Sequence, residues 1–519
     1  MNKLLFRAAA VLLALLLLCG CAAPERGVVS GPAQTGAPDD MDPEAASVNL
    51  LHAKGGWYSS ATGTYVADEI AFSDDWFFAD PAEANPALAL CSMQIEAACS
   101  NNSNGAAILR ELGFYDLETR RYADYGINEC ACTVGVKVLH RDGTDYTLRA
   151  VFIQGSEYGE TGWEQNVTVN GEDPFPSHAG YFPAVTQLLE ELDPQGDPHV
   201  IWWVAGFSRG GGIANMTAAE LAALGETVFA CTFAAPAVTD IGEAAHGPVY
   251  AGIHNYLCDD DLVTMVPPWG MVRFGQDHSL SDFSPADVTS ALRKYNTDAY
   301  IAVGRYYDGM WTVTYGADGS PNGGESIHDF LVRVCSGLEA SVPTRADYSA
   351  PHTDSGTTEE GDVEVTWIPQ DSMICLVRIF FSTADLPFSD MNDAAPLLRE
   401  LIYTELETQL AAQTGDEAMA KDAVGRRWQT ARSLCQAVGD DGVTPEGIYG
   451  LLVIVSPLLI RSASVLESGA LPDLSNADTL PLLMTYMPEA MNLVSSANEL
   501  AFSHHTDTLI VRLQLLCGE

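Results

Sequence analysis

The sequence predicts an α/β fold with a mostly parallel central sheet. Three apolar segments, at 199–205, 228–234 and 252–257, have the length and composition of buried strands. Helical patterns precede the first segment, at 177–192, and follow it, at 211–224. Strands that alternate with helices in this way are typical of a parallel sheet with helices on both faces.

The segments before this core predict a helix and a strand pair. Residues 85–100 have helical periodicity, with Pro86 near the start, where proline suits a helix. Residues 133–140 alternate as a strand, and 146–153 return as a second strand after a turn at 141–144. This pair would extend the sheet.

The pattern changes after the third apolar strand. We predict a helix over 286–307, a polar loop over 345–361 and a strand over 363–367. We therefore assign 56–285 to the core and 286–490 to a large inserted α+β region, which would form a cap over the sheet. Residues 491–519 would then return to complete the core.

The first residues predict export. Lys3 and Arg7 precede a short apolar run, and Leu18-Cys19-Gly20-Cys21 follows, so 1–20 form a secretory signal and not a membrane span. This ending resembles a bacterial lipobox, which implies cleavage before Cys21 and attachment of lipid to Cys21. The protein would then be anchored to the outer face of the bacterial cell membrane. An ordinary signal peptide is the alternative reading.

A tether follows the signal. Residues 21–55 are rich in Ala, Pro, Gly, Ser and Asp, which predicts a flexible segment.

The charge and the cysteine spacing argue against two classes of function. The 519 residues include 25 Lys and Arg against 70 Asp and Glu, a net charge of −45, which argues against nucleic-acid binding. Cys130 and Cys132 are spaced neither for zinc nor for a redox pair, and we expect no metal or organic cofactor.

One motif carries the chemistry. Gly206-Phe207-Ser208-Arg209-Gly210 lies directly between a buried strand and a helix. A sharp turn there lifts the serine hydroxyl above the sheet, and glycines let the two backbones pass closely. The helix N-terminus also directs free N–H groups at the reaction centre. We therefore predict that Ser208 is a nucleophile.

Around this turn the chain resembles the class 3 lipases, a branch of the α/β-hydrolases. The resemblance covers about 57–275 and the last sixteen residues. It rests on the order and spacing of modest motifs, Phe-Ile-Gln-Gly-Ser at 152–156, Ser-His-Ala-Gly-Tyr-Phe at 177–182, Thr-Phe-Ala-Ala-Pro at 232–236 and Asp-Leu-Val-Thr-Met-Val-Pro-Pro at 261–268. It implies an α/β-hydrolase fold and a serine hydrolase, in a divergent bacterial lipoprotein branch.

The resemblance also implies roles for single residues. Ser208 would attack an ester carbonyl, and the oxyanion would be bound by the N–H of Arg209 and by Ser156, through its N–H and its hydroxyl. Asp259, Asp260 and Asp261 are all candidates for the acid. The family spacing to the following valine and proline selects Asp261. His178 lies in the second motif and would help to shape the site.

The base should follow the acid in the chain, which leaves five histidines: His278, His328, His352, His504 and His505. The family's C-terminal signature selects His504, although its proline and tyrosine are absent here. His505 and His328 remain as alternatives.

Three departures from the family mark a divergent branch. They are Phe207 in place of the usual His, Arg209 in place of Leu and Gln154 in place of Arg.

Three functions fit these observations. The first is hydrolysis of carboxylic esters, with lipid esters as the expected substrate, through an acyl-enzyme. The second is a short-chain esterase or other acyl hydrolase. The third is a surface binding protein that kept the fold and lost turnover. The apolar segment 450–460 fits the core of the inserted region, with an acyl-pocket or lid role as the alternative.

Overall fold

The structure is a computed structural model. It describes residues 50–60, 64–100, 104–120, 130–156, 160–171, 177–303, 342–358, 361–370 and 502–518, with isolated positions between 328 and 421. These residues fall into two compact units. One unit holds the described residues up to 303, together with 328–332 and 502–518, and it contains every site residue discussed below that the structure describes.

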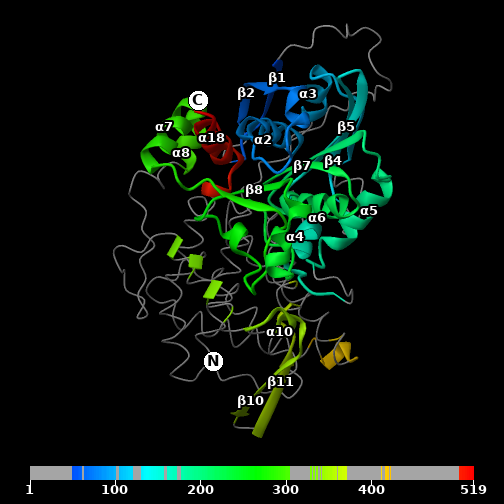
Figure 1. The fold of residues 1–519 in the computed structure, drawn as a ribbon. Helices are drawn as coiled ribbons and strands as arrows, with labels where there is room; N and C mark the ends of the chain where they lie inside the picture. The colour runs from blue at the N-terminus through cyan, green and yellow to red at the C-terminus, as the bar shows by residue number, and fades with distance from the viewer. Residues whose placement is uncertain are drawn as a thin grey trace. The chain divides into compact units, whose positions relative to one another are not determined.

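A seven-stranded sheet forms the centre of this unit (Figure 1). Its strands lie side by side in chain order, β3 (Tyr115–Arg120), β4 (Cys132–Arg141), β5 (Thr144–Ile153), β6 (Val200–Phe207), β7 (Thr227–Phe233), β8 (Ile253–Leu257) and β9 (Gln276–Ser279). The first two pairs are antiparallel, and all pairs from β5 to β9 are parallel. The predicted fold class, α/β with a mostly parallel sheet, is confirmed.

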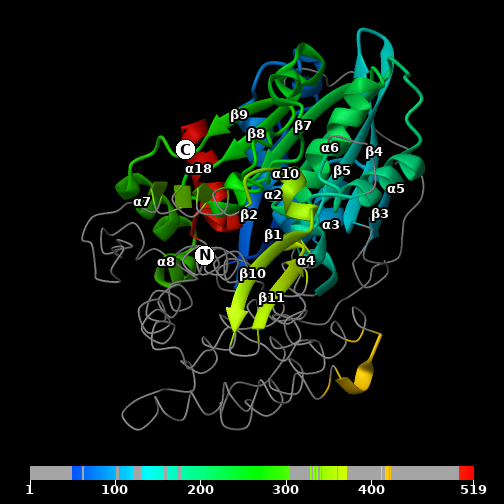
Figure 2. The same cartoon turned by 90° about the horizontal axis from the view of Figure 1, so that it is seen from below.

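Helices cover both faces of the sheet, as Figures 1 and 2 show. Helix α2 (Pro86–Ser100) packs on one face, and a hairpin of β1 (Leu51–Tyr58) and β2 (Tyr65–Phe72), helix α3 (Gly105–Glu111) and the C-terminal helix α18 (Thr506–Cys517) pack around it. Helices α5 (Phe182–Leu192) and α6 (Arg209–Ala223) cover the other face. Helix α4 (Glu160–Val167) lies between β5 and α5 in the chain.

The sequence of α2 explains why it is buried from both sides. Apolar residues lie around the whole helix, with Ser92, Gln94 and Glu96 buried among them. The Asn85 side chain caps its start by accepting from the N–H groups of Ala87 and Leu88. Trp203 on β6 packs beneath it and donates its indole N–H to Ser92 at 2.9 Å. Burial of such a side chain stabilises the fold by about 1.5–3 kcal/mol.

The carboxyl ends of the parallel strands position the site. Ser208 follows β6 directly, Gln154 to Ser156 follow β5, and Asp261 lies four residues beyond β8. Loops at this edge of a parallel sheet converge on one side, which is where open α/β folds bind ligands.

Several expectations for the segments outside the sheet need correction. The core begins at Leu51, so the hairpin takes the last residues assigned to the tether. Helices α7 (Pro285–Tyr295) and α8 (Thr297–Val303) belong to the sheet's unit, although we assigned them to the insertion. They are two helices and not one, because the Asn296 side chain caps the second by accepting from the N–H groups of Asp298 and Ala299.

The second unit contains the other described elements, helix α10 (Arg345–Ser349) and the antiparallel pair β10 (His352–Thr358) and β11 (Gly361–Trp367). The polar loop expected over 345–361 was therefore wrong, because Thr344 caps a helix and the Ser- and Thr-rich run pairs as a strand. The signal, Cys21 and 450–460 lie outside the described residues. Within the described part of the chain, no helix has the length and apolar character of a membrane span.

Candidate active site

Ser208 occupies a strained turn. Its backbone has φ 55° and ψ −127°, a conformation that non-glycine residues adopt rarely. The turn is held by two hydrogen bonds, from the N–H of Ser208 to the carbonyl of Phe233 at 2.9 Å and from the N–H of Gly212 to the carbonyl of Ser208 at 3.1 Å. The serine is therefore fixed at the start of α6, 7% exposed.

The two glycines of the motif are required by close backbone contacts. A Cβ on Gly206 would lie 2.3 Å from the carbonyl oxygen of Gly210, and a Cβ on Gly210 would lie 2.2 Å from that of Ile153. Real Cβ atoms do not approach other atoms so closely. Only glycine lets the first turn of α6 pack against the ends of β5 and β6.

Asp261 is buried beside the turn. It is 1% exposed, and its Oδ1 accepts from the N–H of Val263 at 2.9 Å, which caps the short 3-10 helix η5 (Leu262–Met265). Its other oxygen, Oδ2, lies 2.8 Å from Nδ1 of His504. Of the three neighbouring aspartates, Asp261 is therefore the one that the structure places against a histidine, whereas Asp259 is exposed.

His504 lies between the serine and the acid. It ends the short helix η8 (Phe502–His504), and its Nε2 lies 2.9 Å from Oγ of Ser208. The ring of Phe207 lies 5.0 Å from the His504 ring, centroid to centroid. Phe207, which stands where the family usually has histidine, thus packs against this imidazole. The structure brings Ser208, His504 and Asp261 together.

The two alternative bases are held elsewhere. His505 is buried, and its Nδ1 lies 3.1 Å from Oγ of Ser60 in the β1–β2 turn. Burial, with the neighbouring His504, lowers the pKa of His505 to about 3. His328 is exposed and donates from Nδ1 to the carbonyl of Asp259 at 2.8 Å. Neither contacts Ser208 through these nitrogens.

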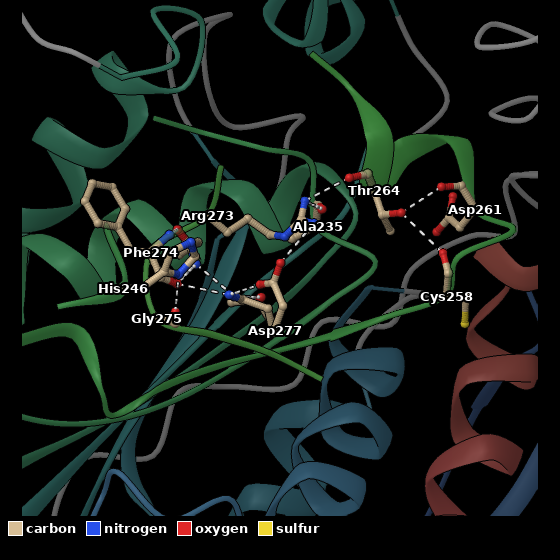
Figure 3. A network of polar contacts seen from close by, with 12 residues as sticks. Ala235, His246, Cys258, Asp261, Thr264, Arg273, Phe274, Gly275 and Asp277 are labelled. Atoms are coloured by element: carbon tan, nitrogen blue, oxygen red, sulfur yellow. Dashed lines mark hydrogen bonds and ion pairs between the residues drawn. The ribbon is translucent and has the colours of Figure 1, made fainter. Parts of the chain in front are cut away.

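A buried polar network supports the loop that carries Asp261 (Figure 3). The Thr264 hydroxyl donates to the carbonyl of Asp261 at 2.8 Å, and Arg273 donates to the carbonyls of Thr264 at 2.9 Å and Ala235 at 3.1 Å. Asp277 lies 3.4 Å from the other end of the Arg273 guanidinium. These hydrogen bonds tie the loop of Asp261 to the segments of Ala235 and Arg273, and they restrict where the carboxylate points.

The segment with Ser156 lies beside the serine turn. A Cβ on Gly155 would lie 3.1 Å from the Phe207 ring, which places this backbone directly against that residue. The Ser156 hydroxyl accepts from the Asn166 side chain at 3.3 Å, and the Tyr181 hydroxyl donates to the same amide at 3.0 Å. Helix α4 therefore helps to hold Ser156.

Arg209 and His178 support the turn from the α5 and α6 side. The Arg209 guanidinium is buried and donates from Nε to the Gln165 side chain at 2.8 Å. His178 is also buried, and its ring stacks on Tyr181 at 3.9 Å. Tyr181 in turn packs against Gly212 in the first turn of α6, where an added Cβ would lie 2.8 Å from its ring. His178 thus shapes the site through Tyr181.

The supporting residues Gln165, Asn166 and Arg273 were not predicted from the sequence. A signal existed for Arg273, which stands in the Met-Val-Arg-Phe run at 271–274, because a cation in an apolar run requires buried partners. Gln165 and Asn166 carry no such signal. Among the described residues, no group of three or more His, Cys, Asp or Glu side chains is arranged to hold a metal ion.

Comparisons with known proteins found a matching family model and a similar solved structure. Residues 175–271 match the model of the class 3 lipase family. Among solved structures, the chain is similar to the triacylglyceride lipase of Rhizomucor miehei, with 20% identity, a TM-score of 0.26, and coverage of 34% of this chain and 71% of that one. No curated protein matches the chain. The matched segment holds Ser208 and Asp261, and over this segment the chain is similar to the class 3 lipases.

Proposed function

We propose that this protein is a serine hydrolase that cleaves carboxylic esters, with lipid esters as its substrate. The observation that carries the proposal is the pair of contacts at His504, 2.9 Å from Ser208 and 2.8 Å from Asp261. A nucleophile bonded to a base that is itself oriented by a carboxylate is the arrangement that activates a serine hydroxyl. The match to the class 3 lipases supports the ester substrate.

The proposed reaction begins with attack by Ser208. Nδ1 of His504 donates to Asp261, which leaves Nε2 free to take the proton from the serine oxygen as that oxygen adds to the ester carbonyl. The buried carboxylate of Asp261 stabilises the imidazolium that forms. His504 then gives the proton to the leaving alcohol, and an acyl-enzyme remains. Water releases the acid in a second cycle of the same proton transfers.

The oxyanion would be bound by the N–H of Arg209 and by Ser156. Two features support this assignment, the start of α6 at Arg209 and the position of the Gly155–Ser156 segment against Phe207. A donor aimed at charge that appears only in the transition state contributes about 3–4 kcal/mol. Asn166 would hold the Ser156 hydroxyl in place for this role.

The substrate test uses esters of increasing chain length. Purified protein should hydrolyse p-nitrophenyl esters faster as the acyl chain lengthens, and Ser208→Ala should lose the activity. Ser92→Ala is the matched control, because it removes another buried serine hydroxyl, one that binds Trp203. Activity on short esters alone would instead indicate a short-chain esterase. Equal rates for wild type and Ser208→Ala would exclude both hydrolase functions and leave the surface binding protein as the remaining hypothesis.

We also propose that Cys21 carries a lipid that anchors the protein at the outer face of a bacterial cell membrane. The Leu-Cys-Gly-Cys sequence after an apolar run supports this. Palmitate fed to a bacterial host should label the wild-type protein and not Cys21→Ser. Equal labelling of both would contradict the proposal.

We also propose that the inserted region, which includes 450–460, forms a cap over the sheet.

A further inference from the structure

Arg512 is a buried cation that the proposed reaction does not use. It stands in the middle of α18, in the apolar run Leu-Ile-Val-Arg-Leu, and it is 2% exposed. A guanidinium taken out of water is costly unless it is paired and hydrogen-bonded. The groups around it therefore indicate why it is there.

Its partners come from three separate segments. One nitrogen, Nη1, donates to the carbonyl of Leu280, just beyond β9. The other, Nη2, lies 3.4 Å from Oγ of Ser503 and 3.9 Å from the carboxylate of Asp260. Arg512 also lies near enough to Cys258 to act on the pKa of its thiol, which it lowers against the larger effect of burial. Figure 3 shows α18 (red) running beside the loop of Cys258 and Asp261.

Two of these partners are the immediate neighbours of the acid and the base. Asp260 precedes Asp261, and Ser503 precedes His504. The acid and the base are 243 residues apart in the chain, so their contact depends on tertiary packing. One guanidinium thus contacts both segments that must meet.

We propose that Arg512 is a positioning residue that holds the His504 segment against the Asp261 loop. This inference rests on the proposed function for its effect on turnover. The planar guanidinium presents its donors in fixed directions, so it sets the spacing between two segments, which a lysine ammonium on a flexible stem does not. A base displaced by about 1 Å can lower a rate by about 10²-fold.

The test compares Arg512→Met, Arg512→Lys and wild type in the full chain. We expect Arg512→Met to lower kcat about 10²-fold and to leave KM within about threefold, because the contacts at issue orient the base and do not bind substrate. Arg512→Lys should recover only part of the loss. Arg149→Met is the matched control, because Arg149 is a half-buried arginine that donates to the carbonyl of Leu192 at 2.7 Å, and its kcat should be unchanged.

A spectroscopic measurement separates positioning from stability. The proton between His504 and Asp261 should give a low-field ¹H NMR resonance that His504→Ala abolishes. Arg512→Met should shift or broaden this resonance at a temperature where the protein is fully folded, and Arg149→Met should not. If Arg512→Met keeps both its kcat and the wild-type resonance, the proposal is overturned.

Two further variants test the proposal if Arg512→Met does not fold. Ser503→Ala and Asp260→Asn each remove one contact and leave the guanidinium in place, and each should lower kcat about three- to tenfold and disturb the resonance. Wild-type values for both would overturn the proposal. If wild type shows the resonance and no ester hydrolysis, the proposed function fails, and loss of the resonance in Arg512→Met would still establish the positioning role.

Discussion

The serine turn and the acid–base pair are built in different ways. The turn consists of consecutive residues at 206–212, and backbone contacts between β5, β6 and α6 fix it. The acid and the base come from loops 243 residues apart, and side-chain hydrogen bonds join them. We therefore expect an added side-chain atom in the turn to destabilise the fold. The geometry of the acid–base pair should instead depend on each polar contact that holds the two loops.

The largest effect is expected from Asp261→Asn. The amide keeps the size of the side chain and loses the charge that stabilises the His504 imidazolium and sets its tautomer. We expect kcat to fall about 10⁴-fold in an ester-hydrolysis assay. Asp259→Asn is the control, because Asp259 is exposed in the same loop, and it should stay within about threefold of wild type. Similar losses in both variants would contradict the assignment of the acid.

The next effect is that of Gly210→Ala on the turn. The added Cβ would lie 2.2 Å from the carbonyl of Ile153, so the start of α6 must move. We expect the free energy of unfolding in urea to fall by about 2–4 kcal/mol, and activity to fall with it. Gly247→Ala has a nearest contact of 3.1 Å and should cost less than about 1 kcal/mol. Wild-type stability in Gly210→Ala would show that the turn is looser than described.

A smaller effect is expected from Thr264→Val in the acid's loop. Valine keeps the shape and removes the hydroxyl that donates to the carbonyl of Asp261 at 2.8 Å. Stability should fall by about 1 kcal/mol and kcat by about tenfold. Thr186→Val removes an exposed hydroxyl that donates within α5 and should change neither measurably. A kcat equal to that of wild type would mean that this network does not position Asp261.

The smallest effect concerns how the free energy of unfolding changes at acidic pH. The folded pKa of His505 is about 3 against an ordinary value of 6.5, so the unfolded chain binds a proton that the folded chain does not. Stability is therefore present above pH 6.5 and is lost as pH falls toward 3. From pH 7 to pH 6 this histidine should cost about 0.7 kcal/mol. His505→Gln should flatten that slope in urea titrations, and an unchanged slope would contradict the buried neutral state.

The same contrast explains how much the sequence could predict. The serine turn and strands β4 to β8 follow from local patterns, because apolar runs and glycine spacing are properties of neighbouring residues. The hairpin of β1 and β2 and the edge strands β3 and β9 were not predicted, since they are partly exposed and polar residues or glycines interrupt their apolar pattern. The polar run of β10 was read as a loop because its pairing with β11 is a tertiary feature.

The choice between His504 and His505 could not be made from local pattern. Both directly precede α18, and the direction of each side chain distinguishes them. His504 is turned toward Ser208 and Asp261, and His505 is turned toward Ser60. The incomplete match to the family's C-terminal signature favoured His504. The contacts that hold this segment, made by Arg512 and Ser60, join residues far apart in the chain, so the sequence did not predict them.

The central claim is that His504 activates Ser208, and labelling with a fluorophosphonate tests it most directly. The probe should modify Ser208 in the wild-type protein, as identified by peptide mass spectrometry. His504→Ala should slow the labelling by about 10³-fold or more, whereas His505→Ala should slow it by less than about tenfold. Labelling of His504→Ala at the wild-type rate would contradict the account.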